Sequence, residues 1–126
     1  MLLLSPPTYG ELAEDLAWAS ACTRLTKTYP VVANCAEVPR PYVIYTRLVT
    51  KLGNDGTYVE GEPFVFVNPL APDRLRVVVH EYAHYILYES GAGKGMSACQ
   101  QEKAVRKVAE HPWTLTERKK YGCLKG

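Results

Sequence analysis

The segment from Pro72 to Gly91 constrains the fold of this chain more than any other. Pro72 suits the first turn of a helix, and the Asp73 carboxylate complements the positive end of the helix dipole. Gly91 suits the position that follows a helix, where the backbone often becomes left-handed. These signals predict a helix from Pro72 to about Glu89.

Capping signals and prolines predict three further helices. The first runs from about Tyr9 to Lys27, after a capping box at residues 8–11 and before Pro30. The second covers about residues 97–110 and is stopped by the proline that follows. A short helix opens with a second capping box and spans about residues 114–122.

Three short strands are predicted between the first two helices. Residues 42–49 are rich in β-branched and aromatic side chains, and a second strand is expected near residues 57–60, after a glycine-rich turn. The third strand is Phe64-Val65-Phe66-Val67, and Pro63 places its start at a sheet edge. We therefore expect an α+β fold with a small antiparallel sheet between an N-terminal helix and the remaining helices.

Length and charge favour one globular domain over residues 1–126. A chain of 126 residues and 14.1 kDa can bury a core of its own. Residues 1–93 carry a net charge of −3 and residues 94–126 a net charge of +5. A basic segment of this size usually forms a solvated helical face, so no nucleic-acid partner is expected.

The cysteines and the N-terminus predict a cytoplasmic protein. The first seven residues contain no basic region and only a short apolar run, which fits neither a secretory signal nor a membrane span. Cys22, Cys35, Cys99 and Cys123 form no CxxC pair, which argues against a cysteine-rich zinc site. Four free thiols in a reducing compartment are the simpler expectation.

The central predicted helix carries the sequence His80-Glu81-Tyr82-Ala83-His84. The two histidines lie one turn apart and about 40° apart around the axis, so both rings can bind one zinc ion. Glu81 can face the same cleft without binding the ion, where its carboxylate would accept a proton from the attacking water. The alternative is that both histidines are ordinary helix residues, which the helical context of the motif disfavours.

A catalytic zinc site needs a third protein ligand. Glu102 is the preferred candidate because it lies in the first turns of the next helix, after a glycine-rich loop that lets this helix fold back. Its neighbours on that face are largely apolar, which suits docking into the domain. His111 at the helix terminus and Glu110 on another face are the alternatives.

These residues together resemble the compact gluzincins, and above all the ImmA/IrrE-type metallopeptidases of bacteria and phages. The resemblance covers roughly residues 42–110, and HExxH is its one highly specific motif. It implies a zincin-like domain with one zinc ion per chain, held by His80, His84 and Glu102, and Glu81 as the catalytic base. It also makes the strand 64–67 the edge along which an extended peptide would lie.

The expected function is therefore zinc-dependent hydrolysis of peptide bonds, with a peptide or protein as the substrate and no membrane partner. Arg106, His111 and Tyr85 are candidates for stabilising the oxyanion. The alternative is a zinc-containing binding module on the same scaffold, which recognises a protein partner without cutting it. The presence of Glu81 favours the enzyme, because a binding module needs no base beside the metal.

Overall fold

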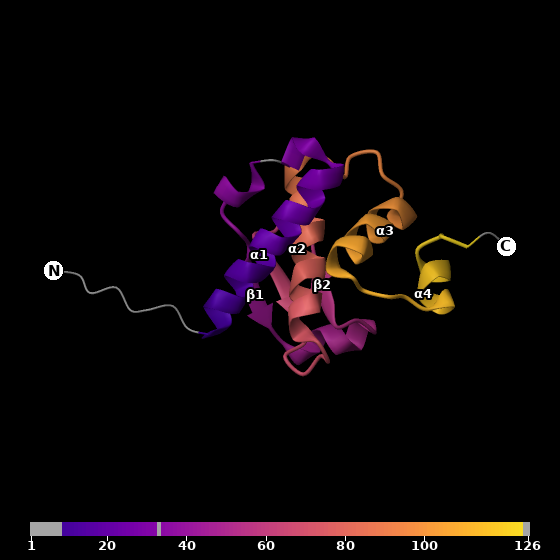
Figure 1. Ribbon diagram of the computed structural model, residues 1–126. Helices are drawn as coiled ribbons and strands as arrows, with labels where there is room; N and C mark the ends of the chain where they lie inside the picture. The colour runs from indigo at the N-terminus through magenta and orange to yellow at the C-terminus, as the bar shows by residue number, and fades with distance from the viewer. Residues whose placement is uncertain (1–8, 33, 125–126) are drawn as a thin grey trace.

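The protein has an α+β fold in the computed structural model, which describes residues 9–32 and 34–124. Four α-helices and one three-stranded sheet are present in these residues (Figure 1). None of the described helices has the length and apolar character that crossing a bilayer requires. In chain order the elements are α1 (Tyr9–Thr28), β1 (Tyr42–Tyr45), β2 (Gly56–Tyr58), β3 (Phe64–Val67), α2 (Arg74–Ser90), α3 (Ala98–Ala109) and α4 (Leu115–Lys120).

The helix ends follow the local signals of the sequence. Gly91 ends α2 with a φ of 81°, in the left-handed conformation that glycine adopts without strain. Capping boxes begin α3 at Ser97 and α4 at Thr114. The capping box predicted at residues 8–11 begins at Thr8, which lies outside the described residues.

The sheet is mixed, so the predicted antiparallel meander is wrong. Its strand order is β1-β3-β2, with β1 parallel to β3 and β2 antiparallel to β3. The first predicted strand stops at Tyr45, because the Thr46 hydroxyl accepts a hydrogen bond from the Leu48 N–H and starts a 3₁₀ helix, η3 (Arg47–Leu52). The chain therefore moves away from the sheet before it returns as β2, and no β1–β2 hairpin forms.

The central position of β3 also overturns its predicted place at a sheet edge. Pro63 was the basis of that prediction, but it only precedes the strand, where a missing N–H is tolerated. Its carbonyl oxygen accepts a hydrogen bond of 3.0 Å from the Tyr42 N–H. The strands 64–67 and 42–45 are thus paired from their first residues, and β1 and β2 form the two edges of the sheet.

The core is centred on α2, which runs through the middle of the molecule and contacts α1, α3 and the sheet (Figure 1). Tyr82 is fully buried and meets the edge of Trp18 from α1, with 5.3 Å between the ring centroids. Leu25 of α1, Val65 of β3 and Val105 of α3 are also fully buried in the same cluster. This packing fixes α2 on three sides.

The described cysteines form two disulfides, so the prediction of four free thiols is wrong. Cys22 of α1 is bonded to Cys35, and Cys99 in the first turn of α3 is bonded to Cys123, which follows α4. The Cα atoms of the two pairs lie 5.9 and 5.1 Å apart. The spacing along the chain did not reveal these pairs because each depends on how two separate segments pack.

Candidate metal centre

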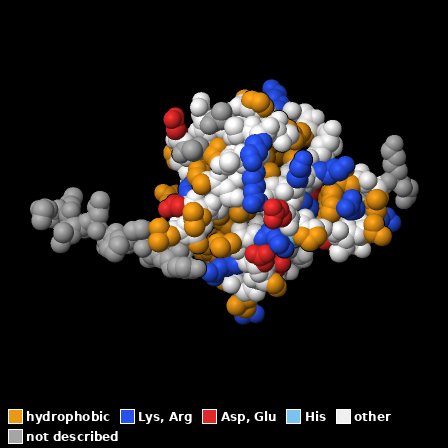
Figure 2. All heavy atoms as spheres, in the orientation of Figure 1, with side chains coloured by type: hydrophobic (Ala, Val, Ile, Leu, Met, Phe, Trp, Pro, Cys, Tyr) orange, Lys and Arg blue, Asp and Glu red, His pale blue; other side chains and the backbone are white. Residues whose placement is uncertain are grey.

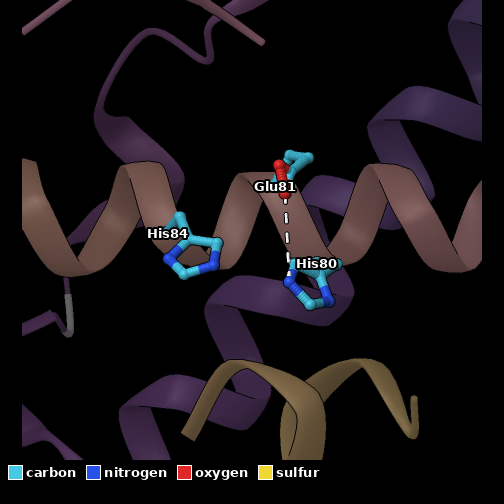
Figure 3. Close-up of side chains that lie close together, drawn as sticks. All are labelled: His80, Glu81 and His84. Atoms are coloured by element: carbon cyan, nitrogen blue, oxygen red, sulfur yellow. Dashed lines mark ion pairs between the residues drawn. The ribbon is translucent and has the colours of Figure 1, made fainter. Parts of the chain in front are cut away.

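The two predicted histidine ligands project from the same side of α2, one turn apart (Figure 3). The centroids of the His80 and His84 rings are 5.1 Å apart. One potential ligand atom from each of His80, Glu81 and His84 lies within 4.8 Å of the others. His80 and Glu81 are buried and His84 is half-buried, so the packed helix places two imidazoles and a carboxylate in a largely buried site.

The predicted third ligand reaches both histidines from α3. One carboxylate oxygen of Glu102, Oε1, lies 3.0 Å from His80 Nε2, and the other, Oε2, lies 3.2 Å from His84 Nε2. Glu102 is buried, with 2% of its surface exposed. Two imidazole nitrogens and one carboxylate therefore converge, which is the donor set of a His₂Glu catalytic zinc site.

Neither of the two alternative third ligands, Glu110 and His111, lies beside both histidine Nε2 atoms as Glu102 does. Glu110 is exposed after the C-terminal end of α3, 3.8 Å from the Arg24 guanidinium, and it does not enter the site. His111 does enter it, but its Nδ1 lies 3.1 Å from Nδ1 of His80 rather than beside the two Nε2 atoms. The contacts of the three side chains thus favour Glu102 as the ligand and place His111 behind the His80 ring.

The two glutamates of the site are both buried, but their pKa values shift in opposite directions. Burial raises the pKa of Glu81, and its Oε2 is buried without a hydrogen-bond partner. Burial also opposes the ionisation of Glu102, but hydrogen bonds from both histidines outweigh it and hold the pKa of this carboxyl well below its usual range. A buried carboxylate oxygen without a donor, beside two imidazoles and an ionised glutamate, is chemistry that a bound cation would satisfy.

Arg106 holds Glu102 in place through Oε1, the oxygen that also contacts His80. Its Nε donates to Glu102 Oε1 at 2.8 Å, Nη1 donates to the Pro112 carbonyl at 3.0 Å and Nη2 donates to Glu117 at 2.8 Å. The guanidinium also lies 5.1 Å from the centre of the Trp113 ring. Each guanidinium nitrogen has a protein partner, so these contacts suit the orientation of Glu102 better than the predicted contact with an oxyanion.

Tyr85, another predicted oxyanion donor, lies outside the site. Its ring packs against Trp18 and Tyr58, and its hydroxyl lies 3.5 Å from the Pro39 carbonyl oxygen. Tyr121, in contrast, lines the cavity that contains His80 and Glu81. No local signal in the sequence marks Tyr121, which reaches the cavity through the turn at the end of α4.

The cavity at the site has a volume of about 340 Å³. Its walls come from α2, α3, the α4 segment and β2 with the turn before it. Gly56 of β2 is packed so closely on α2 that an added Cβ would lie 2.6 Å from Val77 Cγ1 and 3.0 Å from Glu81 Cγ. β2, rather than the predicted strand 64–67, is therefore the edge strand beside the candidate metal ligands.

Comparison of the chain with family models, with curated proteins and with solved structures finds no match. The functional interpretation consequently rests on the chemistry of the residues described above.

Proposed function

We propose that the protein is a zinc-dependent metallopeptidase on a zincin-like domain. The observation that carries this proposal is the convergence of His80 Nε2 and His84 Nε2 on the buried Glu102 carboxylate, with Glu81 beside them. His80, His84 and Glu102 would hold one zinc ion per chain, and three protein ligands leave a coordination position for water or substrate. When bound, zinc supplies Lewis-acid activation of water and of the scissile carbonyl group.

Glu81 is the general base of the proposed reaction. Its carboxylate accepts a proton from the attacking water and then gives that proton to the leaving amine. Its buried position supports this role, because desolvation raises the pKa of Glu81 and brings it nearer to the value that a proton shuttle needs. Glu81 can reach a water beside the proposed metal without a rearrangement of α2, because it directly follows the proposed ligand His80 in this helix.

His111 positions His80 in this proposal. With Nε2 of His80 used as a ligand, Nδ1 carries the proton and donates it to Nδ1 of His111, 3.1 Å away. Burial and the charges of His80 and Arg106 lower the pKa of His111, which favours the neutral ring that can accept this bond. The remaining donor of the His111 ring and the Tyr121 hydroxyl are candidates for stabilising the oxyanion, because both side chains line the cavity.

The substrate is proposed to be an extended peptide paired with β2. One edge of β2 is paired with β3, and its other edge has no partner strand in the sheet of the described residues. The free backbone groups of an edge strand can hold an extended peptide by adding it to the sheet. Gly56 brings this edge against Glu81, so a peptide on β2 would present its backbone to the base.

A zinc-containing binding module remains the competing proposal, and one set of variants separates it from the enzyme. The experiment measures zinc by mass spectrometry in protein purified without added zinc, and cleavage of a peptide library. Glu81→Gln should keep the metal and abolish cleavage, whereas Glu89→Gln, an exposed glutamate at the end of α2, should change neither. Cleavage by Glu81→Gln at the wild-type rate would refute the mechanism, and zinc without cleavage in the wild type would favour the binding module.

The two disulfides change the predicted location of the protein. Two disulfides are typical of proteins in oxidising compartments, whereas the cytoplasmic location expected from the N-terminus came with the expectation of free thiols. We infer that the protein works where Cys22–Cys35 and Cys99–Cys123 stay oxidised. Alkylation of the protein in its native compartment, followed by mass spectrometry, should leave all four cysteines unlabelled; labelling of any of them would contradict this inference.

A further inference from the structure

A second hollow lies on the side of α3 away from the metal centre. It has a volume of about 730 Å³ and is formed by the C-terminal half of α1, by α3 and by the loop between α2 and α3. No residue that lines it also lines the metal cavity. We call it the basic groove, because five cationic side chains line it: Arg24, Lys27, Lys94, Lys103 and Lys107.

The charge of the basic groove is not neutralised by its own walls. No aspartate or glutamate is among the residues that line it. Arg24 donates to the Val108 carbonyl at 2.6 Å and lies 3.8 Å from the exposed Glu110. The four lysines make no ion pair with the described acidic residues. Lys and Arg side chains gather on the face where α1 and α3 lie side by side (Figure 2).

The spacing of these cations produces like-charge repulsion that a bound anion would relieve. Lys103 and Lys107 are one turn apart on α3, and Arg24 and Lys27 are similarly spaced on α1, so each helix carries a repelling pair. The two pairs line the same groove, which adds repulsion between the helices. The sequence predicted the basic C-terminal third to be an ordinary solvated face, but the fold brings three of its cations together with two from α1.

The floor of the basic groove is apolar. Tyr29, Met96 and Ala104 are partly buried and pack against the hydrophobic core, and Val108 is buried. All four line the groove between the cationic side chains. The flexible Met96 side chain and the apolar stems of the lysines can adapt to aliphatic groups. A ligand that fits this groove therefore combines negative charge with apolar side chains.

We propose that the basic groove binds an acidic segment of a partner protein, in which Asp or Glu residues alternate with aliphatic residues. The carboxylates meet the cationic rim and the aliphatic side chains meet the floor. Single-stranded nucleic acid is a poorer fit, because its bases stack on exposed aromatic rings. The one aromatic residue that lines the groove, Tyr29, is partly buried and packs against the core. This proposal does not depend on the proposed hydrolytic activity.

The test uses the full chain and fluorescence anisotropy of a labelled short peptide of alternating Glu and Leu residues. The wild-type protein should bind this peptide, and added salt should weaken binding because surface charges are screened. The double variant Lys103→Glu with Lys107→Glu should weaken it by about tenfold or more. The double variant Arg47→Glu with Lys51→Glu makes the same charge change at exposed positions of η3, outside the groove, and should bind nearly as well as wild type.

Failure of the wild-type protein to bind the peptide would overturn the proposal, and so would an equal loss in both double variants. A peptide with Gln in place of Glu should bind weakly; equally tight binding would contradict the role of charge. Tighter binding of oligothymidylate than of the acidic peptide would assign the groove to nucleic acid instead. If the α3 variant does not fold by circular dichroism, Lys27→Glu with Lys94→Glu must show the same loss, because these lysines line the groove from α1 and from the loop before α3.

Discussion

Replacement of Gly56 by alanine is the sharpest test of how the fold positions the base. The new Cβ would lie 2.6 Å from Val77 Cγ1 and 3.0 Å from Glu81 Cγ. Carbon atoms in contact are normally about 3.5–4.0 Å apart, so β2 and α2 must separate by up to roughly 1 Å or the two side chains must move. Overpacking of this kind costs about 1–3 kcal/mol of stability.

The expected effect on activity is larger than the effect on stability. A misplacement of about 1 Å at a reacting group can lower the rate by roughly a hundredfold, and Glu81 is one of the two side chains that the new methyl group would displace. His80, His84 and Glu102 are not among the closest neighbours of this methyl group, so the zinc content should not change. We therefore expect a loss in kcat at full metal occupancy.

The assay compares kcat, zinc content and the urea midpoint of Gly56→Ala with those of Gly91→Ala. Gly91 has a φ of 81° and no atom within 4 Å of an added Cβ, so its replacement strains only the backbone, by about 1–2 kcal/mol. This control should lose stability and keep its activity. Full activity in folded Gly56→Ala, with normal zinc content, would refute the claim that β2 holds Glu81 in place.

Three further predictions concern the metal ligands and their support. His84→Ala should purify with little zinc and lose the thermal stabilisation that added zinc gives to the wild type, because a ligand of the folded state alone stabilises that state; mass spectrometry and calorimetry measure both. Arg106→Met should lower zinc affinity by about 10–100-fold in a competition titration with a chelator, because Glu102 loses the donor that orients it; unchanged affinity would contradict this role. Cys99→Ser with Cys123→Ser should lower the unfolding free energy by about 2–4 kcal/mol in urea, since the bond closes a loop between residues 24 apart; a loss below the error of the measurement would show that the bond constrains little.

The features that the sequence predicted well depend on short segments of chain. Gly91 and the capping box at Thr114 each mark a helix end within one turn, and these two ends are confirmed. The spacing of His80 and His84 requires only a regular helix to place both rings on one side. Glu102 was predicted from the face that it shares with apolar residues of α3, and the structure places its carboxylate against both rings.

The features that the sequence did not predict depend on packing between distant segments. The order β1-β3-β2 follows from the 3₁₀ turn at Thr46, whose hydrogen bond to Leu48 was not recognised in a segment that looked like a continuous strand. The pair Cys99–Cys123 needs the chain to reverse between α3 and α4. Tyr121 enters the cavity for the same reason, so its place could not be read from its neighbours in sequence.

The orientation of Glu102, the proposed third ligand, depends through Arg106 on α4, a helix that adds little to the core. No side chain of α4 is buried, and this helix is attached through the Arg106–Glu117 ion pair and the bond between Cys99 and Cys123. Arg106 in turn orients Glu102, whereas α2 keeps the two histidines in place by its own packing. Loss of the α4 attachments should therefore weaken metal binding through Glu102 while the core stays folded. In the proposed site, α2 supplies the two histidine ligands, and the C-terminal segment would determine how firmly the metal is held.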